Sequence, residues 1–279
     1  MTESQTRPDT VFRPDLLREQ VVVVSGGGSG LGRALALSAA KLGARVAICG
    51  RRQERLDETA GLVAAAGGLP VMAEALSIRD PEAVSRFVEG VHERFGRLDV
   101  LVNNAGGQFA QAAIDFSVKG WNAVVDTNLN GTWWMMQAAA RQWRDRGQKG
   151  NIVNVVAVVW RGLPGIAHSC AARAGVIYLS KTLATEWAPL GIRVNCVAAG
   201  AIATGGLETY SEEARRELPR SNPMQRFGDA ADVTDAIIYL AAPSGSFITG
   251  ETLVVDGGNQ NWGDQWTIPR PAYFGGPAA

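Results

Sequence analysis

The chain of 279 residues is poor in the features that mark several classes of protein. Its three cysteines, Cys49, Cys170 and Cys196, are odd in number, widely spaced and set among apolar residues, which argues against a disulfide framework or a zinc site. No apolar run approaches the roughly 18 residues that span a bilayer, and the polar start MTESQTRPDT contains no hydrophobic targeting core. We therefore expect a cytoplasmic protein without a metal site.

Net charge is also absent, because 27 Lys and Arg residues balance 27 Asp and Glu residues. A neutral chain has no overall field that would attract nucleic acid or an acidic membrane, so any anionic ligand must be held by local groups. No shift in composition divides the chain, and its length suits one α/β domain.

Short runs of β-branched residues alternate with longer stretches of helical period. Strands are predicted at six of these runs: VVVVSG from Val21, RVAICG to Gly50, LDVLVNN to Asn104, NIVNVVAVV from Asn151, GIRVNCVA from Gly191 and TLVVDGG to Gly258. A long helix is predicted from His168 to Trp187. This alternation is typical of a single-domain Rossmann fold, a doubly wound parallel sheet with helices on both faces.

The segments outside this alternating pattern suggest where the domain begins and ends. We expect an N-terminal arm over residues 1–17, the Rossmann-type domain over 18–258 and a C-terminal tail over 259–279. Within the domain, residues 203–227 place glycines and prolines around the charged stretch EEARRE, which predicts an inserted helical lid.

A glycine-rich loop, SGGGSGLG, follows the first strand directly and precedes a helical stretch. Glycines here allow a tight turn and bring the backbone close to a pyrophosphate at the positive end of the helix. The alternative is a glycine-rich turn without a ligand. The expected cofactor contacts of this loop are Gly26, Gly28, Ser29, Gly30, Leu31 and Gly32.

The end of the second strand indicates which dinucleotide would bind. An NAD-specific site places an acidic residue there, whereas this chain has Arg51 and Arg52. A guanidinium can bind a 2′-phosphate that a carboxylate would repel, so we expect NADP(H) as the cofactor. The alternative is that both arginines form the solvated start of a helix.

Two further strand ends supply candidate cofactor contacts. Ser77, in the stretch ALSIRD, is placed at the end of a further strand, the third along the chain, and could line an adenine pocket, although a plain strand-end serine is the alternative. Asn104, Ala105 and Gly106 follow another strand at the carboxyl edge of the sheet, where a doubly wound fold binds its ligands. They could wall the nicotinamide side of the cleft or form an ordinary turn.

In this order the motifs resemble the short-chain dehydrogenase/reductase family along nearly all of residues 18–258. SGGGSGLG corresponds to the family's TGxxxGxG, NNAG is present, Asn128 in DTNLNGT matches the active-site asparagine, and IRVNCVAAG matches the strand before the substrate loop. The resemblance implies a homotetramer or homodimer joined through long helices. It also implies that Ile202 and Thr204 contact the nicotinamide carboxamide, and that Gly200 lies in a loop that contacts the cofactor.

The chain departs from the family at its catalytic residues. No Ser or Thr occurs between Asn151 and Ala167, so the family's catalytic serine is missing, and its YxxxK aligns with Ser169 and Arg173. Carbonyl reduction yields an alkoxide, and general acid catalysis of its protonation contributes roughly two to four powers of ten. Serine is a poor acid, and arginine cannot relay protons, so ketone or alcohol chemistry is disfavoured.

The stretches HSCAARAGV, NAGGQF and SFITG resemble one branch of the family, the peroxisomal trans-2-enoyl-CoA reductases and, more distantly, the 2,4-dienoyl-CoA reductases. The resemblance implies NADPH-dependent reduction of an acyl-CoA substrate. Because a 2,4-dienoyl reductase of this branch keeps a lysine where Arg173 stands, the 2-enoyl substrate is preferred.

Hydride addition to the β carbon of an enoyl thioester leaves an enolate, which needs hydrogen-bond donors and can be protonated by water. The catalytic residues expected for this reaction are Asn128, Ser169 and Arg173, and Arg173 would also hold the cofactor. His168 is a possible proton source or a packing residue at the helix start.

Other interpretations stay open at this point. One is a 3-hydroxyacyl-CoA or alcohol dehydrogenase with a non-standard proton donor, such as Tyr210 or His168. Another is a catalytically silent NADPH-binding protein.

Two groups of residues outside these motifs are candidates for substrate contacts. Arg215, Arg216 and Arg220 in the predicted lid would meet coenzyme A phosphates or form an exposed charged helix. Trp160 and Arg161 could border the acyl pocket because they follow the strand that normally carries the catalytic serine.

Overall fold

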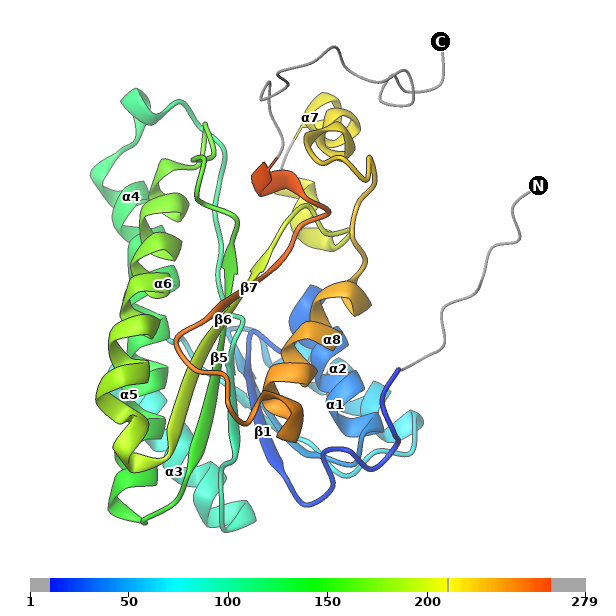
Figure 1. Cartoon of the computed structure of the whole chain (residues 1–279), viewed down its shortest axis with the longest axis vertical. Helices are drawn as coiled ribbons and strands as arrows, with labels where there is room; N and C mark the ends of the chain where they lie inside the picture. Colours follow the sequence, from blue (N-terminus) through cyan, green and yellow to red (C-terminus); the bar gives the residue numbers. More distant parts are fainter. Residues whose placement is uncertain (1–10, 210, 262–279) are drawn as a thin grey trace, which may run out of the picture.

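One parallel sheet organises the molecule. The computed structural model describes residues 11–209 and 211–261, and in this part of the chain seven strands lie in the order β3-β2-β1-β4-β5-β6-β7 with helices on both faces (Figure 1). The strands are β1 (Val21–Ser25), β2 (Arg45–Gly50), β3 (Met72–Ala75), β4 (Val100–Asn103), β5 (Gly150–Ala157), β6 (Ile192–Ala199) and β7 (Thr252–Val255). The prediction of a single doubly wound Rossmann fold is confirmed.

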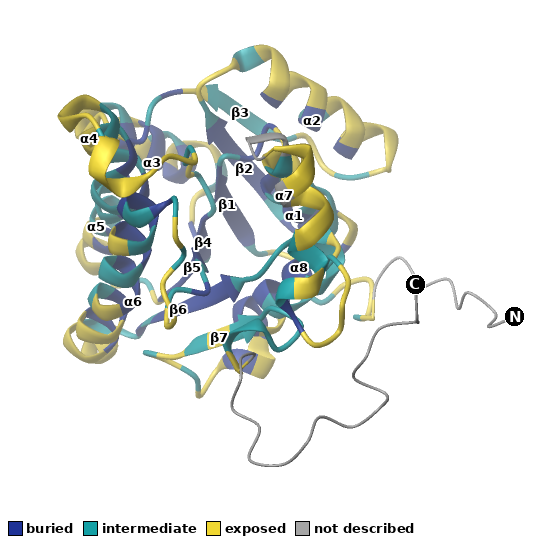
Figure 2. Cartoon of the chain, turned by 90° about the horizontal axis from the view of Figure 1, so that it is seen from above, coloured by how far each residue is buried: buried dark blue, intermediate teal, exposed yellow. Residues whose placement is uncertain are grey.

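The helices form two layers, seen edge-on in Figure 2. One layer contains α1 (Gly30–Lys41), α2 (Gln53–Ala65) and α8 (Ala230–Ala241). The other contains α3 (Pro81–Phe95), α4 (Val118–Val125), α5 (Gly131–Asp145) and α6 (Ala167–Trp187), the last of which is the predicted long helix. No helix in the described ranges is both long and apolar enough to cross a membrane.

The central strand β1 shows why these residues form a doubly covered sheet. Val21 and Val23 belong to the core under α3 and α5, while Val22 and Val24 belong to the core under α1 and α8. All four are at most 2% exposed. A strand that is buried on both faces needs apolar residues at every position, which the run of four valines supplies.

The predicted lid lies between β6 and α8 in the chain. It contains α7 (Glu212–Glu217) between two short helical turns, Gly205–Thr209 and Leu218–Ser221. Residues 1–10 of the predicted arm and 262–279 of the predicted tail lie outside the described residues. Leu17, at the end of the arm, is buried, and its backbone N–H donates to Leu42 O at 2.9 Å.

A chain of buried polar side chains joins the three elements that carry most of the candidate site. Asn103 on β4 donates to Asn154 on β5 at 2.8 Å, and Asn154 donates to the Ser180 hydroxyl on α6 at 2.9 Å. Ser180 in turn donates to Val176 O at 2.7 Å. Each of the three polar side chains is at most 1% exposed, so their hydrogen bonds cannot be replaced by water without moving the core.

The Asn154→Ala variant tests this chain. It removes an acceptor from Asn103 and a donor from Ser180, and each buried group left without a partner costs about 1–3 kcal/mol. We expect the free energy of unfolding, measured by urea titration, to fall by about 2–4 kcal/mol with an unchanged m value. A loss below about 0.5 kcal/mol would show that the amide contributes nothing to stability.

Candidate functional site

The site begins between β1 and β4, where the order of the strands in the sheet reverses. β1 pairs with β2 on one side and with β4 on the other, and the connecting helices leave toward opposite faces. Such a switch point opens a crevice at the carboxyl ends of the strands. Ser25, the last residue of β1, joins the ends of β1 and β4, because its hydroxyl accepts from the backbone N–H groups of Asn104 and Ala105, each at 3.1 Å.

The glycine-rich loop is held against the end of β4. The Asn104 side-chain amide donates to Ser25 O at 3.1 Å and to Gly26 O at 3.3 Å. Gly32 packs directly on Gly26 O and the Asn104 side chain, and a Cβ at position 32 would overlap both. Gly32 therefore allows α1 to start against the loop.

The amino end of α1 is available to a ligand. Ser29 occupies the N-cap position, but its side chain makes no capping hydrogen bond to the helix. The first backbone N–H groups of a helix have no partner within the helix, and together with the helix dipole they favour an anion. The loop therefore fits a pyrophosphate group.

Two connected pockets follow the crevice. The outer pocket has a volume of about 480 Å³ and lies around the glycine-rich loop and the ends of β2 and β3. The inner pocket has a volume of about 610 Å³ and lies over the ends of β5 and β6. The two share the residues Leu31, Asn104, Gly106, Gly107, Gln108, Thr204 and Gly206, so they form one cleft.

Most of the residues predicted to bind the cofactor line this cleft. Those that line the outer pocket are Gly26, Gly28, Ser29, Gly30, Leu31, Arg51, Arg52, Ser77, Asn104, Ala105, Gly106 and Thr204. Gly200, Ile202, Asn128 and Arg173 line the inner pocket. Gly32 and Ser169 line neither pocket.

Asn128 lies in a π-helical turn, Asp126–Asn130, between α4 and α5. Its side-chain oxygen accepts from Gly107 N at 2.9 Å, and its Nδ2 donates to Gly107 O at 3.0 Å and to the Ser169 hydroxyl at 3.3 Å. These bonds use both N–H groups of the amide. Asn128 therefore fixes the Gly106–Gly107 turn against α6 and has no remaining donor for a substrate.

Arg173 on α6 places a positive charge in the wall of the inner pocket. The residue is 8% exposed, and its Nη1 has no hydrogen-bond partner among the described residues. The guanidinium approaches Gly106 so closely that a Cβ there would overlap Nη2. Burial lowers the pKa of Arg173 from its ordinary value to about 10, so the guanidinium keeps its charge at neutral pH.

Ser169 lies behind Asn128 rather than in the cleft. It is 2% exposed, and its hydroxyl accepts the hydrogen bond from Asn128 Nδ2. The structure thus connects Ser169 to the cleft through Asn128.

Ionisable side chains are scarce in the inner pocket. Arg173 is the one such side chain among its described lining residues, and no Tyr, His, Lys, Asp, Glu or Cys accompanies it there. Tyr210, one of the alternative proton donors, lies outside the described residues. Much of the rest of the wall is apolar, with the side chains of Ala157, Val158, Leu163, Pro164, Ile166, Leu207 and Leu218.

His168 packs among aromatic rings next to the cleft. Its ring stacks on Phe116 with centroids 4.5 Å apart and meets Phe109 edge-on at 4.6 Å. It is fully buried, its Nδ1 accepts from Ser169 N at 2.7 Å, and desolvation lowers its pKa. Its Nε2 is buried without a hydrogen-bond partner among the described residues, and His168 lines neither pocket of the cleft, which favours a packing role over a proton source.

Other residues named from the sequence lie in different surroundings. Trp160 and Arg161 are not among the lining residues of the inner pocket, and Trp160 is half exposed. Arg215 and Arg216 are exposed on α7, and Arg220 pairs with Glu217 at 2.9 Å. Gln108 and Arg55, which sequence reasoning did not single out, line the cleft. Arg51 precedes Arg52, the N-cap residue of α2, so no helical spacing relates Arg51 to Arg55.

Exchanging His168 for phenylalanine tests whether its ring nitrogen supplies a proton. The variant keeps the aromatic packing, so we expect kcat for the preferred substrate to stay within about threefold of the wild type between pH 6 and 8. Steady-state kinetics over this range provide the measurement. A loss of a hundredfold, in the range of general acid catalysis, would make His168 a proton donor.

Comparison with known proteins places the chain among oxidoreductases. Residues 26–260 match the family model described as enoyl-(acyl carrier protein) reductase. The chain is 38% identical over 260 residues to a probable 2,4-dienoyl-CoA reductase, (2E)-enoyl-CoA-producing, of Bacillus subtilis, an alignment that covers 91% of this chain and 100% of that protein.

Two other relatives carry different names. A 3-oxoacyl-[acyl-carrier-protein] reductase of Thermotoga maritima is 37% identical over 245 residues, covering 87% of this chain and 98% of that one. Among solved structures, a citronellol catabolism dehydrogenase of Pseudomonas aeruginosa superposes with a TM-score of 0.81 at 38% identity, covering 90% of this chain and 99% of that one.

Proposed function

Because the chain belongs to the short-chain dehydrogenase/reductase family, we propose that it is an NADPH-dependent reductase of the carbon–carbon double bond in a 2-enoyl-CoA. The observation that carries this proposal is the chemistry of the inner pocket, where the one ionisable side chain among the described lining residues is an arginine.

The cofactor assignment has two supports. The uncapped start of α1 lines the outer pocket, and Arg173, with its unpartnered Nη1, lines the inner pocket, so one cleft offers groups suited to the pyrophosphate and to the nicotinamide ribose. Arg51 and Arg52 line the outer pocket beside Gly28, where they can neutralise a 2′-phosphate. When bound, NADPH supplies the hydride.

No proton-donating side chain is among the described lining residues of the inner pocket. The negative charge that hydride transfer creates on the substrate must therefore reside on an oxygen that is stable without immediate protonation. Reduction at the β carbon of an enoyl thioester meets this condition, since the charge is delocalised onto the thioester oxygen. Arg173 carries unused N–H groups and a permanent charge at the pocket wall, and each donor placed toward such an oxygen contributes on the order of 3 kcal/mol. The α carbon then takes its proton from water.

The neighbouring residues position this arginine and the cleft. Asn128 holds the Gly106–Gly107 turn against which the guanidinium packs, and Ser169 holds the Asn128 amide in place. In this account Arg173 contacts the ligands, whereas Asn128 and Ser169 act as positioning residues.

The pocket walls support an acyl-CoA as the proposed substrate. Leu163, Ile166, Leu207 and Leu218 offer an apolar surface to an acyl chain. Arg215 and Arg216 on the lid are exposed cations that could meet coenzyme A phosphates.

We also propose that the protein assembles with copies of itself in the cytoplasm, as a homotetramer or homodimer. Large apolar side chains on its surface support this assembly. Tyr178 on α6 is 71% exposed, and Phe247, shortly before the edge strand β7, is fully exposed.

Ketone reduction is the second candidate, because the Thermotoga maritima relative is named a 3-oxoacyl reductase. Oxidation of NADPH, followed in parallel with 2-enoyl-CoA, 2,4-dienoyl-CoA and 3-ketoacyl-CoA, separates the two. We expect turnover of the 2-enoyl thioester with a saturated acyl product. Preferential turnover of 3-ketoacyl-CoA would contradict the proposal, and tight NADPH binding without turnover would indicate a silent binding protein.

Variants of α6 test the proposed roles. Arg173→Ala removes donors used by both ligands, so we expect a tenfold or greater rise in the Kd for NADPH and a loss of about a hundredfold in kcat/KM. Ser169→Ala should lower kcat by about three- to tenfold with an unchanged Kd, since it acts through Asn128. Thr182→Ala, an exposed change on the same helix, is the control. Wild-type kinetics in both test variants would remove these residues from the mechanism.

A further inference from the structure

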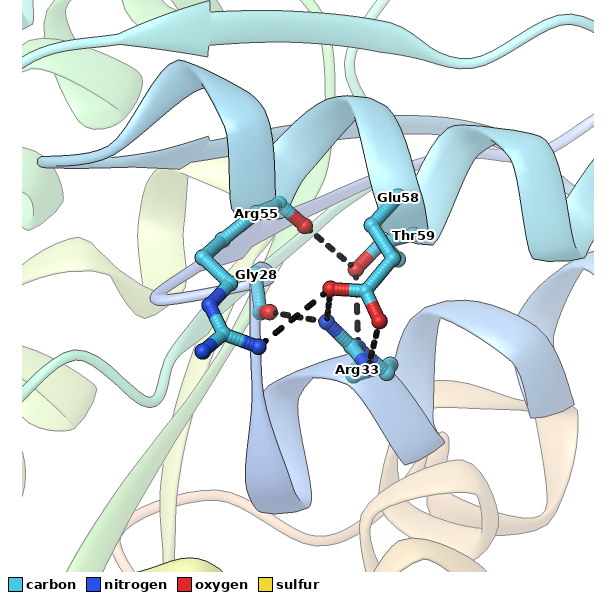
Figure 3. Close-up of polar contacts among 5 residues, drawn as sticks. All are labelled: Gly28, Arg33, Arg55, Glu58 and Thr59. Carbon is cyan, nitrogen blue, oxygen red and sulfur yellow. Dashed lines mark hydrogen bonds and ion pairs between the residues drawn. The ribbon is translucent and has the colours of Figure 1, made fainter.

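The glycine-rich loop packs against α2 as well as against the end of β4. A Cβ at Gly28 would lie 3.0 Å from Arg55 Cβ and 3.3 Å from Arg55 C, so the loop and the first turn of α2 are pressed together. Figure 3 shows the side chains that surround this contact. They come from α1, the loop and α2.

Arg33 on α1 occupies the centre of this group. Its Nη2 donates to Gly28 O at 2.8 Å and to Glu58 Oε2 at 2.7 Å, and its Nη1 donates to Glu58 Oε1 at 3.1 Å. Its Nε donates to the hydroxyl of the buried Thr59 at 3.2 Å. Four of the five N–H groups of the guanidinium are therefore engaged, which fixes its plane and that of the Glu58 carboxylate.

Glu58 is shared between two arginines. Besides its paired contact with Arg33, its Oε2 lies 3.4 Å from Arg55 Nη1, one turn earlier on α2 (Figure 3). The hydrogen bonds from Arg33 hold the pKa of Glu58 below its ordinary value, so the carboxylate stays charged at neutral pH. The Thr59 hydroxyl donates to Arg55 O at 3.1 Å and fixes the backbone of the same turn.

Arg55 is the member of this group that reaches the cleft. It lines the outer pocket together with Arg51, Arg52, Gly28 and Ser29. Its side chain is 48% exposed, and a long side chain of this kind has many rotamers when nothing holds it. Glu58 removes part of that freedom before any ligand arrives.

We propose that Arg55 contacts the 2′-phosphate of the cofactor, and that the Arg33–Glu58 pair is a positioning device that presents Arg55 to it. The inference rests on the proposed NADPH dependence. Coenzyme preference then depends in part on Glu58, a negative side chain that does not itself contact the phosphate.

The direction in which Glu58→Gln changes the affinity for NADPH distinguishes a positioning role from direct electrostatic repulsion. A carboxylate near a phosphate repels it, so on charge alone Glu58→Gln would tighten NADPH binding. If Glu58 positions Arg55, the same change weakens NADPH binding. The ratio of the affinities for NADPH and NADH isolates this effect, because loosening of the loop itself weakens both dinucleotides.

Isothermal titration of the full-length protein with NADPH and with NADH provides the test. We expect the NADPH-to-NADH affinity ratio to fall by about tenfold in Arg55→Ala and by about threefold in Glu58→Gln. The double variant should match Arg55→Ala alone, because Glu58 acts through Arg55. Glu82→Gln, which removes a comparable surface carboxylate paired with Arg86 on α3, should leave the ratio unchanged.

Several outcomes would overturn the inference: an unchanged or raised ratio in Glu58→Gln, a double variant weaker than Arg55→Ala, or an equal loss in Glu82→Gln. A wild-type protein without preference for NADPH would overturn the cofactor assignment as well, and that result is visible before any variant is made. A wild type that prefers NADPH with an unaffected Glu58→Gln ratio would overturn the positioning role alone.

Discussion

The site depends on one buried positive charge. Removing a guanidinium from water carries a free-energy cost, and Arg173 Nη1 has no partner among the described residues to offset it. The charge nevertheless persists at neutral pH, because even the lowered pKa of about 10 lies well above 7. A residue held in this state is suited to a ligand that brings hydroxyl groups or developing negative charge.

The residues around Arg173 leave space for its guanidinium and hold the neighbouring backbone in place. Gly106 must lack a side chain because the guanidinium occupies that space, and Asn128 holds the adjacent Gly107 through two hydrogen bonds and contacts Ser169 through a third. The buried Asn103, Asn154 and Ser180 fix β4, β5 and α6 relative to one another. The position of Arg173 is thus set by backbone turns and buried hydrogen bonds. A fixed guanidinium can stabilise an oxyanion without moving, but it cannot supply a proton. This combination favours a reaction that forms an enolate over one that forms an alkoxide.

Residue patterns predicted the sheet and brought together residues that line the outer pocket of the cleft, because both follow from short-range rules. Four consecutive valines require a strand buried on both faces, and strand ends of a parallel sheet meet at one edge, which brings the glycine-rich loop, Arg51 and Asn104 together. The short β3 was located only through Ser77, since its residues MAEA carry no β-branched side chain.

The substrate side was less predictable. Gly162 and Gly165 have positive φ values of 69° and 87°, and the chain they turn presents Leu163 and Pro164 to the pocket in place of Trp160 and Arg161. The family resemblance placed Ser169 at the site, but only the π-helical turn of Asn128 shows that an amide stands between it and the cleft. The pairing of Arg33 with Glu58 joins residues 25 positions apart, which no local period reveals.

The most direct test of this account is the position of the solvent-derived hydrogen in the product. The reaction of a 2-enoyl-CoA with NADPH is run in deuterium oxide, and the acyl product is analysed by mass spectrometry and NMR. The account predicts one deuterium at the α carbon and hydride from the cofactor at the β carbon. Hydride delivered to a carbonyl carbon, with a hydroxyl product, would contradict it.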